Sequence, residues 1–140
     1  MFYSDESLPI EIGIVAFGGS GFTHNGSGRV PELITSYNQL WAGQPRKFDP
    51  APDLVIYNEG TNDGGDISAD FEAVVAAVQA AVGPKCKQLL LLPFNLGHKE
   101  IAAVVKKVAK PNVVFGDTTG FYDGANGLHP FGYNVLRIAI

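Results

Sequence analysis

Apolar residues in this chain follow two spacings, that of a buried strand and that of one face of a helix. Four short aliphatic runs, each ending at or just before Gly, Asn or Pro, predict strands: 10–17, 53–58, 87–92 and 112–115. Two other sets recur at i, i+3, i+4 and i+7 and predict helices: Phe71, Val74, Val75, Val78 and Val82, then Ile101, Val104, Val105 and Val108. Further helices are expected over 30–41 and from Pro130 to the end of the chain.

This alternation of strands and helices predicts an α/β fold built on a parallel sheet of about four strands, with helices on both faces. In such sheets the functional site lies beyond the carboxyl ends of the strands. The loops expected there are also the richest in Gly, Asn, Asp and His: 18–25, 59–66 and 117–129. The site is therefore expected where these loops meet.

Composition narrows the class of protein. The chain has 140 residues, of which 46% are apolar, and this is enough for a single domain over 1–140 with its own core. A net charge of −4 argues against a nucleic-acid partner or a polybasic membrane contact, and no apolar run is long enough to cross a bilayer. Residues 1–7 carry two acids and no basic residue, so they do not resemble a secretory signal peptide.

The sequence predicts no bound cofactor and no metal. The single cysteine, Cys86, excludes an internal disulfide and a cysteine-based zinc site, and no spacing of His, Asp and Glu resembles a metal site. The glycine-rich stretch 18–21 lacks the Lys-Ser/Thr that ends a phosphate-binding loop, so nucleotide binding is not expected. The expected partner is a small-molecule substrate.

Two polar motifs could carry chemistry. In the segment 60–63 (Gly-Thr-Asn-Asp), the Asn62 amide follows a strand and can donate to a developing oxyanion. Spacing alone favours a helix cap or an Asx turn for this segment. His129 is held just before a proline on a short loop, which suits a general base, although an ordinary exposed histidine would have the same pattern. His24, in a Gly-rich loop, and His98, at the start of a predicted helix, are interpreted as ordinary histidines.

Three motifs in this order resemble the SGNH hydrolases, also called GDSL-type esterases: Gly18-Gly19 after the first strand, Gly60-Thr61-Asn62-Asp63 after the second, and His129-Pro130 near the end. The resemblance runs in register from Pro9 to the end of the chain. It implies a flavodoxin-like three-layer fold and hydrolysis of esters with short acyl groups, including acetyl groups on carbohydrates. It further implies that Gly19, or its neighbour Gly18, and Asn62 donate to the oxyanion. His129 would then be the general base.

The chain departs from the family pattern at two points. The family's first strand, which ends in Gly-Asp-Ser and carries the nucleophile, is missing, so the domain is shortened at its N-terminus. Ser20 is then the first candidate nucleophile because it follows the oxyanion glycine, and Ser7 is the alternative, with Ser4 behind it. Each of these could also be an ordinary loop or tail serine. At the second point, Asn126 stands where the family has the Asp that holds the imidazole, and Asp123 lies nearby to take that role.

The sequence leaves two functions open: an ester hydrolase acting on a small ester, or an inactive SGNH-like remnant that acts as a binding or structural module. The missing strand also affects the sheet, because an unfilled slot would leave buried backbone groups unpaired. The strands containing Ile14 and Val55 are therefore expected to pair directly or to accept residues 1–7 of a second copy. This predicts some tendency to form homo-oligomers.

Overall fold

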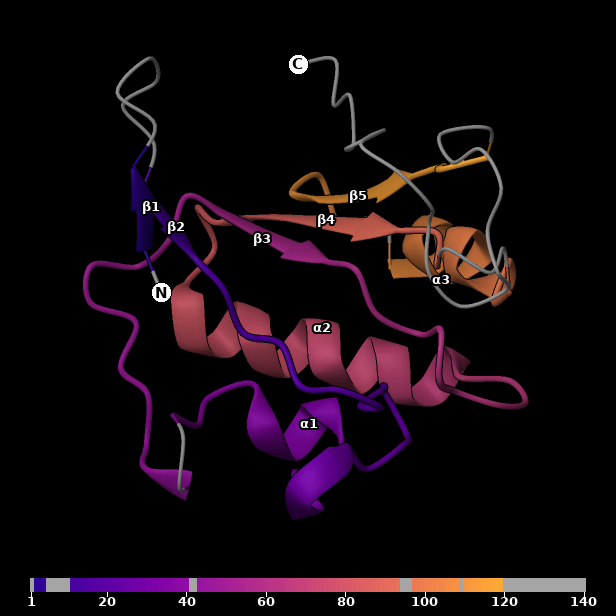
Figure 1. Cartoon of the computed structure of the whole chain (residues 1–140). Helices are drawn as coiled ribbons and strands as arrows, with labels where there is room; N and C mark the ends of the chain where they lie inside the picture. The colour runs from indigo at the N-terminus through magenta and orange to yellow at the C-terminus, as the bar shows by residue number, and fades with distance from the viewer. Residues whose placement is uncertain (1, 5–10, 41–42, 94–96, 109, 120–140) are drawn as a thin grey trace.

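The computed structural model of the chain describes residues 2–4, 11–40, 43–93, 97–108 and 110–119 (Figure 1). At its centre, parallel strands pair in the order β3-β4-β5: Leu54–Tyr57, Lys87–Leu91 and Val113–Gly116. The helices α2 (Ser68–Val82) and α3 (Glu100–Val108) connect consecutive strands of this sheet. The predicted α/β class is confirmed, and so are the strands expected near 53–58, 87–92 and 112–115.

The helix α2 carries much of the apolar core. Its predicted core residues are all buried: Phe71, Val74, Val75, Val78 and Val82. They belong to one cluster with Tyr57 of β3 and Leu90 of β4, and Figure 1 shows α2 running beneath the sheet. The helical period places these side chains on a single stripe, so burying that stripe against the sheet is what fixes the position of α2.

The helix α3 is amphipathic in the same way. Ile101 and Val104 are buried in the core, whereas Lys106 and Lys107 are exposed. Lys107 Nζ forms an ion pair with Glu72 of α2 at 2.6 Å, across the outer surface of the two helices. None of the helices in the described parts of the chain has the length and apolarity needed to cross a membrane.

The helix predicted over 30–41 is much shorter in the structure. Over the described positions 30–40 it is confined to α1 (Leu33–Ser36), which follows a 3-10 turn, η1 (Ser27–Arg29). Ser36 Oγ donates back to the backbone oxygen of Glu32 at 3.1 Å. Such back-bonding and the β-branched residues of this segment both weaken helix formation, which explains the difference.

The strand predicted over 10–17 is only partly confirmed. Among its described residues, 11–17, strand geometry is confined to β2 (Glu11–Gly13), which pairs antiparallel with β1 (Phe2–Ser4) and not with the central sheet. Of the two arrangements expected for the strands containing Ile14 and Val55, direct pairing is wrong, and insertion of residues 1–7 of a second copy stays a prediction. The described residues form a central sheet of three strands, not four. A short β-branched run fits an edge hairpin as well as a buried strand, so its pattern could not decide between them.

Apolar side chains are exposed in β2 and the two residues after it, and on the face of the central sheet opposite α2. These side chains have between 41% and 54% of their surface exposed: Ile12, Ile14, Val15, Leu54, Ile56 and Val114. Within the described residues, helices thus cover one face of the sheet. The prediction that helices cover both faces is confirmed for this face only. The helix predicted from Pro130 lies outside the described residues.

Candidate functional site

Two loops that are far apart in the sequence meet beyond the carboxyl end of β3. They are the Ser20 loop (residues 18–25) and the Asn62 loop (residues 58–66). The side-chain Nδ2 of Asn62 donates to the backbone oxygen of Ser20 at 2.8 Å. The structure thus brings Asn62 next to Ser20 and its neighbour Gly19, at the sheet edge where the sequence predicted a site.

Asp63 holds the two loops together, a role that the sequence analysis missed. Its Oδ2 accepts the backbone N–H of Phe22 at 2.8 Å, and its Oδ1 accepts the backbone N–H and the hydroxyl of Thr23 at 2.7 and 2.8 Å. Gly21 lies directly against this carboxylate, so a side chain there would overlap it. The glycine at 21 and the acid that ends the 60–63 motif are the signals that could have indicated this contact.

Ser20 is nearly buried, with 9% of its surface exposed, and its hydroxyl faces two acceptors. Oγ lies 2.9 Å from the backbone oxygen of Phe17 and 3.0 Å from Oε1 of Glu59. Since a hydroxyl has one hydrogen, it donates to one of these oxygens at a time. Glu59 was not predicted as a site residue. The signal for it was an acid placed directly after the apolar run 53–58.

Glu59 is half-buried, and burial is the main cause that raises the pKa of its carboxyl group from 4.5 to about 7. The hydrogen bond from Ser20 lowers this pKa, and the negative charge of Asp63 raises it further. Glu59 can therefore gain or lose a proton near neutral pH, which is what a general acid or base must do. Such a carboxyl group in contact with a serine hydroxyl marks the Ser20–Glu59 pair as a candidate reactive centre.

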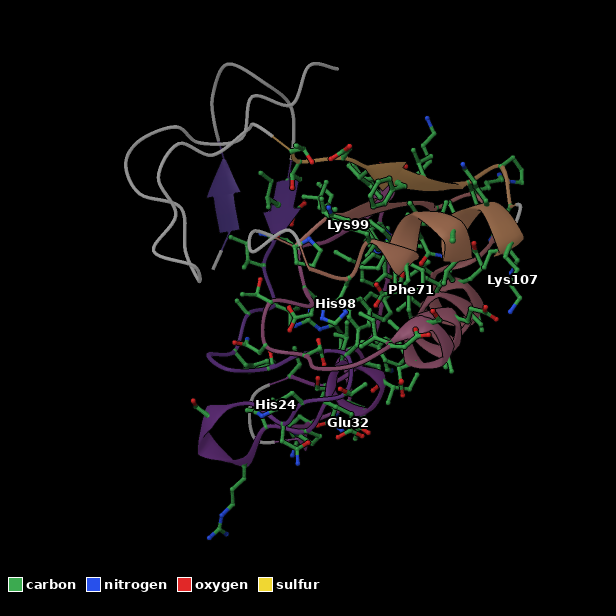
Figure 2. The ribbon with its side chains drawn as sticks, turned by 90° about the vertical axis from the view of Figure 1, so that its right-hand side faces the viewer. His24, Glu32, Phe71, His98, Lys99 and Lys107 are labelled. Atoms are coloured by element: carbon green, nitrogen blue, oxygen red, sulfur yellow. The ribbon has the colours of Figure 1, made fainter. Side chains whose placement is uncertain are left out.

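Figure 2 shows His24 and His98 in this region, with His98 closer to the sheet. His24 is exposed, and its Nδ1 lies 3.0 Å from the backbone oxygen of Gly19. The side chain of His98 is nearly buried, with Nδ1 2.8 Å from Oε1 of Glu100 and Nε2 3.1 Å from the backbone oxygen of Asp63. His98 lies just before α3, at the helix start where the sequence analysis placed it, and its ring links the Asn62 loop to that helix.

The remaining predicted site residues lie outside the described residues: Ser7, Asp123, Asn126 and His129. Ser4 belongs to β1, where it stands opposite Glu11. In the parts of the chain that the structure describes, no group of three or more His, Cys, Asp or Glu residues is arranged to hold a metal ion. The described site is thus built from Gly19, Ser20, Glu59 and Asn62, with Asp63 as their support.

Comparisons of the chain with family models, with curated proteins and with solved structures give no match. The chemistry of the Ser20–Glu59 pair and the Asn62 amide is therefore what directs the functional interpretation.

The raised pKa of Glu59 predicts a pH-dependent effect of Glu59→Gln on stability. Because the folded state raises this pKa from 4.5 to about 7, the wild type loses stability as the pH rises through that window. Glutamine cannot ionise and escapes this loss. Allowing for partial exposure of the group, we expect the variant to gain about 1 kcal/mol relative to the wild type between about pH 5 and about pH 8.

Urea unfolding of both proteins at the two pH values measures this difference. Asp70→Asn, which removes an exposed carboxylate from the first turn of α2, is the control. A stability difference for Glu59→Gln that stays constant between the two pH values would contradict the prediction.

Proposed function

We propose that this chain is an ester hydrolase of the SGNH type, acting on small esters with short acyl groups, in which Ser20 is the nucleophile. The observation that carries the proposal is the meeting of three groups that acyl transfer needs. A nearly buried serine hydroxyl contacts a carboxyl group, and a side-chain amide lies against the same serine's backbone. Serine hydrolysis requires a nucleophile, a proton acceptor and oxyanion donors within one small volume.

The oxyanion donors in this scheme are Asn62 and Gly19. A side-chain amide has two hydrogens, and the Asn62 amide gives one of them to the backbone oxygen of Ser20, so its second hydrogen can serve a substrate oxygen. Among the described residues, the backbone N–H of Gly19 has no hydrogen-bond partner. Both donors adjoin Ser20, which supports their assignment to the developing negative charge.

In the reaction, Ser20 Oγ forms a bond to the acyl carbon, and the carbonyl oxygen takes up the negative charge. The Oγ proton passes to a base, for which the sequence offers His129, and from the base to the leaving alkoxide. The alcohol departs and leaves an acyl-serine. Water then attacks the acyl carbon by the same route, the bond to Oγ breaks, and the carboxylic acid leaves while Ser20 regains its proton. Asn126 or Asp123 would hold the imidazole of His129 in this scheme.

One observation favours the alternative, an inactive module with the same scaffold. The Ser20 hydroxyl lies within hydrogen-bond distance of the backbone oxygen of Phe17, three residues earlier, as the hydroxyl of a purely structural serine would. A structural serine and a nucleophile differ in their reactivity toward electrophiles, which makes the two functions separable by a direct experiment.

We expect a fluorophosphonate probe to label the folded chain at Ser20, and Ser20→Ala to lower hydrolysis of p-nitrophenyl acetate by about 1,000-fold or more. Peptide mapping identifies the labelled serine. Ser27→Ala is the matched control, because Ser27 is exposed and lies on the neighbouring turn η1. Labelling at Ser7 would show that Ser7, and not Ser20, is the nucleophile. A wild-type protein that shows neither labelling nor hydrolysis would support the inactive module.

A further inference from the structure

The position of the Ser20 hydrogen depends on whether Glu59 carries a proton. An ionised Glu59 is an acceptor only, and it attracts the hydroxyl hydrogen more strongly than the neutral oxygen of Phe17 does. A neutral Glu59 can instead donate its own hydrogen to Oγ, and Ser20 then donates to Phe17. In the first state the lone pairs of Oγ are available for attack, and in the second state one of them is occupied.

Glu59 has no cationic partner among the described residues. The ion pairs that they form are His98–Glu100 and Lys107–Glu72, and the hydrogen-bond partner of the Glu59 carboxyl group there is Ser20. Glu59 is therefore not held as one half of a structural ion pair. A half-buried carboxyl group that has a serine hydroxyl as its partner is better explained by proton transfer than by stabilisation.

The charged and titratable groups around this pair act on it unequally. Asp63, on the same loop, makes ionisation of Glu59 harder through its negative charge. His98, from the start of α3, bonds to the backbone oxygen of Asp63, and His24, from the Ser20 loop, bonds to the backbone oxygen of Gly19. The histidines thus contact the backbone of the two loops.

The backbone on both sides holds Ser20 and Glu59 at their short distance. Glu59 lies two residues after the end of β3 and precedes Gly60, whose φ is +111° and which packs closely against Pro93. On the other side, the backbone oxygen of Ser20 accepts a hydrogen bond from Asn62. The 3.0 Å contact between Oγ and Oε1 is therefore set by anchored backbone, as a reactive pair requires.

We propose that Glu59 is the proton acceptor of Ser20, so that the two side chains form a two-residue nucleophile. This inference rests on the proposed ester hydrolase function and assigns to Glu59 the proton that the sequence scheme assigned to His129. As Oγ bonds to the acyl carbon, its hydrogen passes to Oε1 of Glu59. The tetrahedral intermediate then expels the alkoxide, which takes that proton and departs as the alcohol. Water then attacks the acyl carbon and gives a proton to Glu59. The bond from the acyl carbon to Oγ breaks, Ser20 takes the proton back, and the acyl group leaves as the carboxylic acid.

The first test does not depend on activity and follows the titration of the Glu59 carboxyl carbon by NMR in the wild type and in Ser20→Ala. Because the bond from Ser20 stabilises the carboxylate, its loss in the variant should raise the pKa of Glu59. An unchanged pKa would overturn the inference, since Ser20 would then not donate to the ionised form.

The second test measures the rate of fluorophosphonate labelling of Ser20 against pH. In the wild type the rate should rise with pH through about 7 as Glu59 ionises. Glu59→Gln keeps an acceptor oxygen but cannot take up the proton, so we expect labelling to slow by about 100-fold or more. The matched control is Asp66→Asn, because Asp66 on the same loop also accepts a serine hydroxyl, that of Ser68, yet is exposed. Labelling of that variant should match the wild type.

His129→Ala separates this inference from the proposed function. If His129→Ala slows labelling by about 100-fold and Glu59→Gln leaves the rate unchanged, His129 accepts the Ser20 proton. The inference about Glu59 is then overturned, and the hydrolase function stands. A wild type that is not labelled at any pH would reject the hydrolase function and a catalytic Glu59 together. The NMR titration would then still report whether Ser20 donates to Glu59.

Discussion

Gly60→Ala is expected to lower the free energy of unfolding by about 3 kcal/mol or more. Gly60 is buried and has a φ of +111°, a conformation that alanine adopts only with strain. A Cβ at this position would lie 2.8 Å from Cγ of Pro93, whose rigid ring is itself fully buried. Neither the backbone nor the ring can move away easily, so strain and steric overlap add to one another.

Urea unfolding measures this loss, with Gly64→Ala as the control. Gly64 belongs to the same loop, but a Cβ there would meet no atom within 4 Å, and its φ is not positive. Because Gly60 directly follows Glu59, Gly60→Ala should also slow fluorophosphonate labelling, even where enough protein remains folded to assay. Equal unfolding midpoints for the two variants would show that the loop does not depend on glycine at this position.

The second large effect is expected from Asp63→Ala, which should cost about 2–4 kcal/mol. The substitution removes the carboxylate that accepts the backbone N–H groups of Phe22 and Thr23 and the hydroxyl of Thr23. Phe22 is 1% exposed and packs its ring 5.5 Å from that of Phe71, so its amide would lose its partner in a buried setting. The Ser20 loop would then lose its main attachment to the Asn62 loop.

Amide hydrogen exchange at Phe22 and Thr23 reports this detachment directly, and both amides should exchange faster in the variant. Asp117→Ala serves as the control, because Asp117 is exposed and its carboxylate accepts hydrogen bonds from Thr119, two residues away on the same segment. It should change stability by less than about 1 kcal/mol. Unchanged exchange in Asp63→Ala would mean that the two loops are joined by other contacts.

Local patterns in the sequence predicted the helices and strands that are defined by residues close together along the chain. The five apolar positions of α2 lie on one face by spacing alone, and all five are buried. The strands β3, β4 and β5 could be predicted in the same way, because each is a short apolar run bounded by turn residues. The rule that sites lie beyond the carboxyl ends of parallel strands predicted that the Ser20 and Asn62 loops would lie together, although the run before the Ser20 loop is not a strand of the central sheet.

The partners within that site could not be predicted in the same way. Ser20 and Glu59 are 39 residues apart, and Asp63 is 41 residues from Phe22. Their contacts depend on how the chain between the two loops is folded, which no local periodicity encodes. His98 is a similar case, since 35 residues separate it from Asp63, whose backbone oxygen it contacts.

By itself, then, the sequence determined the α/β class and the buried stripe of α2, because these follow from spacing along one segment. Tertiary structure decided which acceptors the Ser20 hydroxyl faces and which loop the Asp63 carboxylate holds. It also decided that the run 10–17 supplies β2 to a hairpin with β1 and no strand to the central sheet. An apolar β-branched run can pair with any free strand edge, so only the competition among edges in the folded chain selects its partner.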